Sequence, residues 1–205
     1  MNALALVLFV VWFVIVFVVR SFIQKRATGD SGIRPGAFAD DASWVERVAY
    51  VLLFLAFAGG IAAPVAAMAG LDPLTDHQAV RLGGLLVAMA GIVLTYMAQL
   101  AMGAEWRIGV DRDEATGLVT YGMFAIVRNP IFTAMIFTAV GVAALVPNLI
   151  AITALVCLVV AIELQVRLVE EPHLLNLHGP AYRDYATRVG RFVPAVGRSV
   201  APARP

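Results

Sequence analysis

Long apolar runs, separated by short polar segments, constrain this sequence more than any other feature. Five of them predict helices, at residues 4–19, 48–70, 79–102, 131–146 and 149–169. About 20 such residues are needed to cross the hydrocarbon core of a bilayer. Hydrophobic residues make up 61% of the chain and charged residues 14%, against about 45–50% and 25% in soluble domains. We therefore expect an all-α integral membrane protein with about five transmembrane helices.

The run at 4–19 is followed by Arg20, whereas a secretory signal carries its positive charge before the apolar run. We therefore expect a first spanning helix that stays attached. The run at 131–146 has 16 residues, about 24 Å of helix, so it is predicted to tilt or to stop short of the far side. A tight turn at Pro147-Asn148 joins it to the next run and predicts an antiparallel helical hairpin.

The positive charges are strongly asymmetric along the chain. Of the 15 Lys and Arg residues, 14 lie in the 20–47 loop, the 103–128 loop or the region from Arg167 onward, and only Arg81 lies on the other side. The positive-inside rule then places the N-terminus outside and both polar clusters and the C-terminus in the cytoplasm. A net charge of +1 gives no general basic field, so no nucleic-acid partner is expected.

Cysteine and histidine give no metal signal. The single cysteine, Cys157, excludes an intrachain disulfide and a multi-cysteine metal site. His77, His173 and His178 share no ligand spacing and have no suitable carboxylate or cysteine partner, so no metal is expected.

The first candidate site is the segment 116–132, centred on Arg128-Asn129-Pro130. Asn129 is a good N-cap and Pro130 a preferred first helical residue, so a helix is predicted to begin there. Its free amide groups and positive dipole end, beside Arg128, would suit a carboxylate or a phosphate. The alternative is an ordinary arginine that extends to the membrane edge.

A second polar cluster follows the hairpin. Glu163 and Arg167 have the spacing of an ordinary ion pair on one helical face. Glu170 and Glu171 point about 100° apart on a helix, so one arginine cannot easily satisfy both, and at least one is free to meet a cation from elsewhere. Pro172 is expected to bend or restart the helix.

A short amphipathic helix is predicted at residues 181–189, after the stop-and-restart signal His178-Gly179-Pro180. It places Tyr182, Tyr185 and Val189 on one face, with Arg188 near its end. In the third apolar run, Tyr96 and Gln99 share a helical face; Tyr96 is either an interfacial anchor or part of a pocket wall.

These residues resemble the isoprenylcysteine carboxyl methyltransferase and phospholipid methyltransferase superfamily of membrane enzymes. The resemblance covers residues 116–194 and rests on an ordered series: Leu118-Val119-Thr120, Gly122, Arg128-Asn129-Pro130, Glu170-Glu171, Leu174, Gly179, Tyr182, Tyr185 and Arg188-Val189. The chain departs from the pattern at four positions. Asn129 stands where the family often has histidine, Phe124 and Phe132 replace tyrosines, and Thr116 falls where eukaryotic members have histidine.

The resemblance implies S-adenosylmethionine as the methyl donor. It implies donor binding by Thr116, Leu118, Val119, Gly122, Phe124, Asn129, Pro130, Phe132, Glu170 and Glu171. Arg128 and Arg188 are the candidates to hold the acceptor, and Glu171 is assigned to the donor's ammonium or ribose. Residues 1–115 would form a transmembrane scaffold, 116–194 the methyltransferase region and 195–205 a tail.

The acceptor stays open at this point, although a lipidic or isoprenylated molecule entering sideways from the bilayer is implied by the resemblance. A carboxylate is already nucleophilic at neutral pH and needs only a cation to hold it. An amine needs a base, for which Glu170 or Glu171 would serve, while Arg128 would hold a lipid phosphate. A small thiol is a third possibility. The non-enzyme alternative is a small membrane scaffold or transporter subunit.

Overall fold

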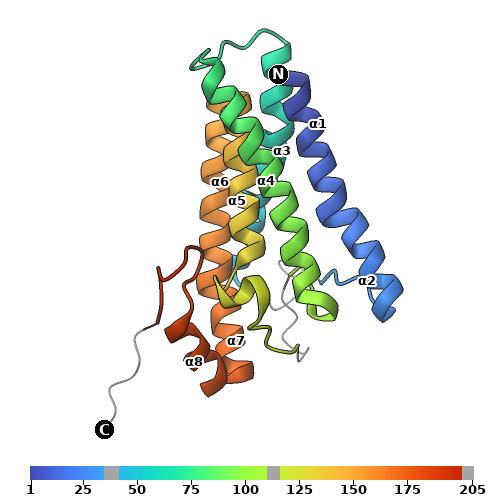
Figure 1. The fold of residues 1–205 in the computed structure, drawn as a ribbon, viewed down its shortest axis with the longest axis vertical. Helices are drawn as coiled ribbons and strands as arrows, with labels where there is room; N and C mark the ends of the chain where they lie inside the picture. The colour runs from blue at the N-terminus through green and yellow to red at the C-terminus, as the bar shows by residue number, and fades with distance from the viewer. Residues whose placement is uncertain (35–41, 110–115, 200–205) are drawn as a thin grey trace.

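The chain folds into a bundle of long helices with a smaller helical cluster at one end (Figure 1). The computed structural model describes residues 1–34, 42–109 and 116–199. Parts of the 20–47 and 103–128 loops and the end of the predicted tail therefore lie outside the described residues. The helices are α1 (Asn2–Phe13), the π-helical η1 (Val14–Val19), α2 (Arg20–Thr28), α3 (Trp44–Met68), α4 (Gln78–Met102), the 3-10 turns η3 (Gly103–Glu105) and η4 (Gly122–Ala125), α5 (Pro130–Leu145), α6 (Leu149–Gln165), the π-helical η5 (Val166–Glu170), α7 (Glu171–His178) and α8 (Pro180–Arg188).

The predicted all-α membrane architecture is confirmed. Among the described residues, four continuous helices are long and apolar enough to cross a bilayer: Asn2–Thr28, Trp44–Met68, Gln78–Glu105 and Leu149–His178. The fourth predicted segment, α5, is a shorter apolar helix of 16 residues. Four of the five expected spans are therefore helices of spanning length, and the fifth, α5, is a shorter helix that lies between α4 and α6 in sequence.

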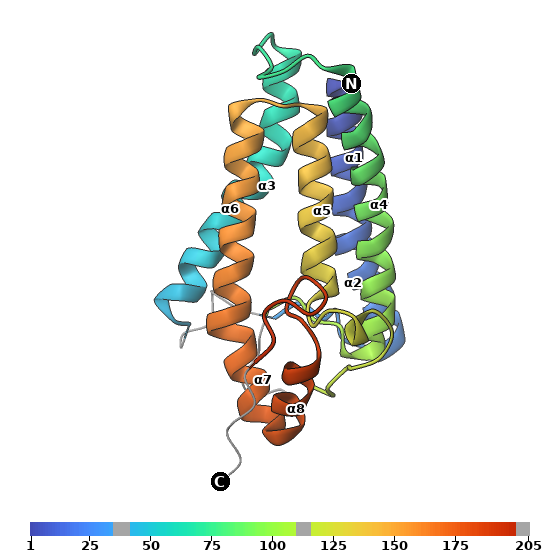
Figure 2. The ribbon, with the colours of Figure 1, turned by 60° about the vertical axis from the view of Figure 1, so that its left-hand side comes forward.

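Small residues bring α4 and α5 into close contact. A Cβ atom added at Gly141 would lie 2.2 Å from the amide nitrogen of Ala88, and one added at Gly91 would lie 2.5 Å from the amide nitrogen of Thr138. Such approaches require glycine. They allow dispersion contacts between the helix backbones, which matter because the hydrophobic effect does not drive helices together in lipid. The short helix α5 is therefore held along α4 by packing, as Figure 2 shows.

The helix pair α3 and α6 packs in the same way. An added Cβ at Gly59 would lie 2.6 Å from the Cβ atom of Ala154. The turn between α5 and α6 is tied to this pair by Asn148, which is 1% exposed. Its Nδ2 donates to the carbonyl of Ala63 at 3.0 Å, and its Oδ1 accepts from the amide of Ala151 at 3.0 Å, so one side chain both caps α6 and fixes α3.

At the opposite end of the bundle, helix α6 does not break at Pro172. It passes through the π-helical turn η5 and continues as α7 to His178. Proline has no amide hydrogen to donate to the carbonyl one turn back, and the wider π turn just before it accommodates the missing hydrogen bond. The predicted stop and restart is confirmed: α7 ends at His178, Gly179 adopts a φ of +52°, and α8 begins at Pro180.

Candidate functional site

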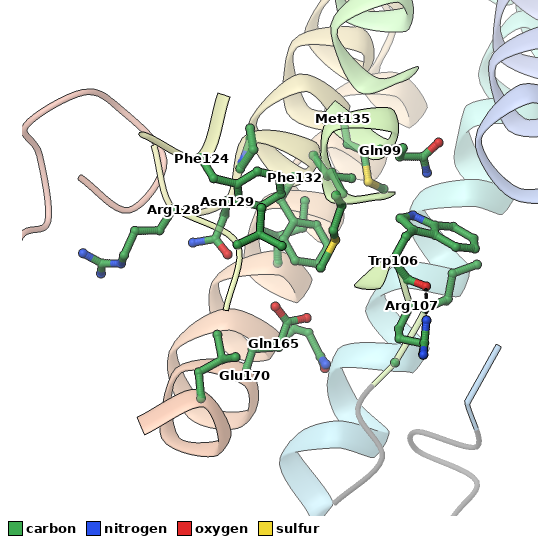
Figure 3. Close-up of a pocket in the computed structure, with 18 of the residues that line it drawn as sticks. Gln99, Trp106, Arg107, Phe124, Arg128, Asn129, Phe132, Met135, Gln165 and Glu170 are labelled. Atoms are coloured by element: carbon green, nitrogen blue, oxygen red, sulfur yellow. Dashed lines mark hydrogen bonds between the residues drawn. The ribbon is translucent and has the colours of Figure 1, made fainter. Parts of the chain in front are cut away.

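A cavity of about 220 Å³ lies at the polar end of the bundle, and Figure 3 shows residues that line it. The predicted site residues that line it are Thr116, Leu118, Val119, Phe124, Arg128, Asn129, Pro130, Phe132 and Glu170. Chain regions on both sides of the α5–α6 hairpin therefore meet around one hollow. Gly122, Glu171 and Arg188 are not among the lining residues, and each has a different environment.

Gly122 opens the short turn η4 with a φ of +60°, a value that glycine adopts without strain. Its place in the structure is a backbone turn that brings Phe124 to the cavity wall. Gly122 therefore sets the course of the backbone, whereas neighbouring residues of the same segment line the cavity.

The two adjacent acids diverge, as their helical angle predicts. Glu170 lines the cavity, whereas Glu171 turns to two arginines outside it. The Glu171 carboxylate accepts from Arg128 Nη2 at 2.7 Å, from Arg191 Nε at 2.7 Å and from Arg191 Nη2 at 2.8 Å. These charge-assisted bonds occupy Glu171 within the protein, which leaves Glu170 as the acid that faces the cavity.

Arg128 belongs to the cavity wall through its backbone and stem, while its guanidinium points away from Phe132, Gln165 and Trp106 (Figure 3). Besides Glu171, it donates to the carbonyls of Ala186 at 3.0 Å, Val189 at 2.7 Å and Gly197 at 3.2 Å. In this structure Arg128 therefore fastens the C-terminal segment to the start of α5. It is not the arginine at a membrane edge that the local sequence also allowed, because it is buried.

Arg188 is not brought to this network, contrary to the expected convergence with Arg128. Its side chain is 71% exposed and pairs with Asp184 of the same helix at 3.6 Å. The buried face of α8 is taken by Tyr182, Tyr185 and Ala186, so Arg188 falls on the open face.

Arg191, rather than Arg188, joins Arg128 at Glu171. The chain turns back at Gly190, where an added Cβ atom would lie 2.1 Å from the carbonyl oxygen of Val193. Arg191 follows this turn and reaches Glu171. The sequence signal that could have found it is the glycine between two arginines in Arg188-Val189-Gly190-Arg191, because a glycine just after a helix marks a change of direction.

The residues around Asn129 pair with this returning segment. The amide of Arg128 donates to the carbonyl of Gly190 at 2.8 Å, and that of Asn129 to the carbonyl of Arg191 at 3.1 Å. Asn129 is the N-cap residue of α5, as predicted, and Pro130 is its first residue. The Asn129 side chain makes no capping bond, however, and its Nδ2 donates to the Arg191 carbonyl at 3.2 Å. The cap position is thus used to join two segments.

Tyr182 and Tyr185 form the floor of the cavity from α8. Their ring centroids are 6.2 Å apart in an edge-to-face arrangement, and Tyr185 Oη donates to the carbonyl of Phe124 at 2.6 Å. Burial raises the pKa of Tyr185 to about 12, and burial also raises the pKa of Tyr182. Both phenols are therefore protonated at neutral pH and act as fixed donors or packing surfaces rather than as bases.

The far side of the cavity contains residues that the signature does not include, among them Gln99, Trp106, Met135 and Gln165 (Figure 3). Gln99 is 2% exposed and its Nε2 donates to the carbonyl of Val16 at 3.0 Å. Of the two polar residues noted in this helix, Gln99 forms pocket wall and Tyr96 does not line the cavity. Trp106 had no local sequence signal, because it lies in a loop between two apolar runs.

The part of the chain that matches a known family includes several segments that form this cavity. A family model described as phospholipid methyltransferase matches residues 79–181, half of the chain. The chain belongs to the phospholipid methyltransferase family. The matched residues of this family member include α4, α5, α6 and the Glu170-Glu171 pair, whereas α1 to α3 and the Arg191 segment lie outside the match.

Curated relatives are similar over part of their length. The chain is 27% identical over 125 residues to protein-S-isoprenylcysteine O-methyltransferase A of Arabidopsis thaliana, and 29% identical over 125 residues to the B protein of that plant. Each match covers 60% of this chain and 64% of the relative. The nickel-cobalt-cadmium resistance protein NccN of Alcaligenes xylosoxydans xylosoxydans is 28% identical over 111 residues, 54% of this chain and 49% of that protein. The chain thus spans less than two thirds of the length of these relatives.

Proposed function

We propose that this protein is an S-adenosylmethionine-dependent methyltransferase that acts on a lipidic acceptor at the cytoplasmic membrane face. The observation that carries the proposal is the cavity itself. The family-matched segments on both sides of the hairpin line it, and it combines one acidic side chain, Glu170, with apolar and aromatic walls. The distribution of positive charges along the chain supports the cytoplasmic placement.

The chemistry of the lining residues fits the methyl donor. S-adenosylmethionine presents cationic groups, ribose hydroxyls and an aromatic purine. Glu170 offers a carboxylate, and Gln165 Oε1 is a buried acceptor that no described group satisfies. Phe124 and Phe132 offer flat apolar surface. We assign the donor's ammonium or ribose to Glu170 rather than Glu171, because Glu171 is already bound by two arginines.

The lining residues contribute position and environment to the transfer. When bound, S-adenosylmethionine supplies a methyl group on a positive sulfur, which makes that methyl group electrophilic. Asn129 and the start of α5 hold one wall fixed through the bonds to Arg191, and the protonated tyrosines close the floor. Fixed walls align donor and acceptor and keep water out, the two contributions that an in-line displacement most requires.

The acceptor is proposed to carry an apolar chain that lies between α3, α5 and α6. Leu53, Phe132 and Ile162 line the cavity. One helical turn further into the bundle, the same three helices line a small apolar hollow of about 40 Å³. The alignment of the two hollows supports a lipidic acceptor. Carboxyl O-methylation of an isoprenylcysteine-like molecule is the first candidate, since two relatives carry that activity in their names.

N-methylation of a lipid amine is the second candidate, and a specific observation favours it. The guanidinium of Arg128 is turned to Glu171 and to backbone carbonyls, whereas a carboxylate, Glu170, faces the cavity. An amine acceptor needs a base to remove its proton, and under this candidate Glu170 takes that role in place of the donor contact assigned above. A carboxylate acceptor would instead require a cation, and Arg107 is a second arginine among the lining residues.

The test is equilibrium binding of S-adenosylmethionine to the purified protein in detergent, followed by incubation of labelled donor with a lipid extract and identification of the product. We expect saturable binding that Glu170→Gln weakens. The matched control is Glu163→Gln, which removes an acid of the same helix that pairs with Arg167 at the surface. Absence of saturable binding to the unaltered protein would refute the proposed function, and an ester or a methylated amine in the product would decide between the two acceptors.

A further inference from the structure

A buried arginine lies near the end of the first membrane helix. Arg20 is 3% exposed, and the helix that carries it is outside the family-matched region. A charged side chain in such a segment is costly unless it is paired, and it points to a role beyond spanning the membrane. Here the guanidinium is turned inward, where its Nη2 donates to the carbonyl of Gly103 at 2.5 Å.

Gln24 repeats this contact one helical turn later. It is 1% exposed, and its Nε2 donates to the carbonyl of Ala104 at 2.7 Å. Residues four apart share a helical face, so both side chains meet the same short segment. Gly103 and Ala104 directly follow α4, where helix carbonyls lack partners and the dipole favours a cation. Two polar side chains of the first helix therefore satisfy the carbonyl groups that directly follow the end of α4.

The segment fixed in this way leads directly to Trp106. The Arg20 guanidinium lies over the Trp106 ring, 4.7 Å from its centroid, a distance at which the ring face attracts a cation. An added Cβ atom at Gly32 would lie 3.0 Å from the same ring, so the chain after α2 presses against the indole as well. Trp106 is 2% exposed, and it lines the cavity.

Trp106 stands on the side of the cavity away from Arg128 and Glu170. Figure 3 shows it beside Met135 and Gln99 and apart from Arg128. The neighbouring wall residues Met102, Val16 and Phe17 are apolar, whereas Gln99 and Arg107 beside the indole are polar, and Glu170 and Gln165 come from the helix on the other side. The indole therefore offers apolar ring surface to a ligand on the side of the cavity away from Glu170.

We propose that Arg20 and Gln24 are positioning residues that hold Trp106 against the apolar part of the methyl acceptor. This inference rests on the proposed function and extends it, because it assigns a part of the acceptor site to the first helix. Loss of Arg20 would free the indole to move while leaving the acidic side of the cavity, and with it donor binding, in place.

The test compares Arg20→Ala and Arg20→Lys with Arg26→Ala. Arg26 is a matched control, since it lies on the same helix over another ring, that of Phe22 at 4.5 Å, and both residues are exposed. Three measurements are made on each variant: the KM and kcat for the lipid acceptor, the affinity for S-adenosylmethionine, and the accessibility of Trp106 to acrylamide. The Trp106 signal is obtained by difference, from each protein with and without Trp106→Phe.

Arg20→Ala is expected to raise the acceptor KM about tenfold, the effect of about 1.4 kcal/mol from the lost ring contact and hydrogen bond. Donor affinity and kcat should stay near their original values, and acrylamide should quench Trp106 more strongly. Arg20→Lys keeps the charge but not the planar stacking, and it should fall between Arg20→Ala and the unaltered protein.

Unchanged quenching of Trp106 in both Arg20 variants would overturn the inference, as would equal losses in donor affinity and acceptor KM. The quenching arm needs no catalysis. It therefore remains decisive even if the unaltered protein fails to bind the donor, which would refute the proposed function alone.

Discussion

Replacing Glu171 by glutamine tests the network that fastens the C-terminal segment. Glu171 receives three hydrogen bonds from Arg128 and Arg191, and the side chains of Glu171, Arg128 and Arg191 are 17%, 2% and 16% exposed. Removing one partner of such a buried pair costs about 3–5 kcal/mol. Glutamine keeps one acceptor oxygen, so we take the lower limit, about 3 kcal/mol, which corresponds to about a hundredfold in the opening equilibrium.

The effect should be local. The amides of Arg191 and Val196 are bonded within the returning segment, and that of Ser199 is bonded to Ala186. Hydrogen exchange followed by mass spectrometry should therefore show about a hundredfold faster exchange in residues 189–199. Exchange in the turns of α4 and α5 around Gly91 and Gly141 should be unchanged, since their contact consists of close backbone packing.

Glu163→Gln is the matched control. It also removes a carboxylate that pairs with an arginine, Arg167, but the two side chains are 37% and 53% exposed. An exposed pair contributes about 0–1 kcal/mol, so exchange near the C-terminus should barely change. Equal exchange in the two variants, or a Glu171→Gln protein whose residues 189–199 exchange at the original rate, would refute the assignment of Glu171 as the anchor of this segment.

Two further outcomes are expected. Gly141→Ala should lower the thermal unfolding midpoint by several degrees, since its Cβ atom would lie 2.2 Å from the nitrogen of Ala88, whereas Gly83→Ala should not, because nothing lies within 4 Å of an added Cβ there. Arg191→Ala should speed C-terminal hydrogen exchange as Glu171→Gln does, while Arg188→Ala, whose side chain is 71% exposed, should leave it unchanged; the reverse order would contradict the network described.

Local patterns in the sequence predicted most of the helices and several of their ends. The apolar runs predicted the helices because hydrocarbon requires apolar side chains and satisfied backbone groups. Asn129-Pro130 predicted the start of α5, and His178-Gly179-Pro180 predicted the stop of α7 and the start of α8. These signals act over one turn of chain, so no knowledge of distant segments is needed.

The C-terminal end of α6 shows the limit of such local reasoning. Pro172 lacks an amide donor, and the sequence predicted a bend or restart there. The helix does not restart: the chain forms the π-helical turn η5 and continues to His178. A local rule identifies the missing hydrogen bond, whereas the surrounding packing determines how the backbone accommodates it.

What the sequence determined alone is the membrane class, the helical hairpin and the two polar segments that flank the hairpin, since each depends on short-range pattern. Only the tertiary structure decided that Arg191 rather than Arg188 reaches Glu171, that Glu170 rather than Glu171 faces the cavity, and that Arg20 supports Trp106. These pairings join residues 20 to 86 positions apart in the sequence. They follow from how helices pack and where the chain turns back, which neighbouring residues do not encode.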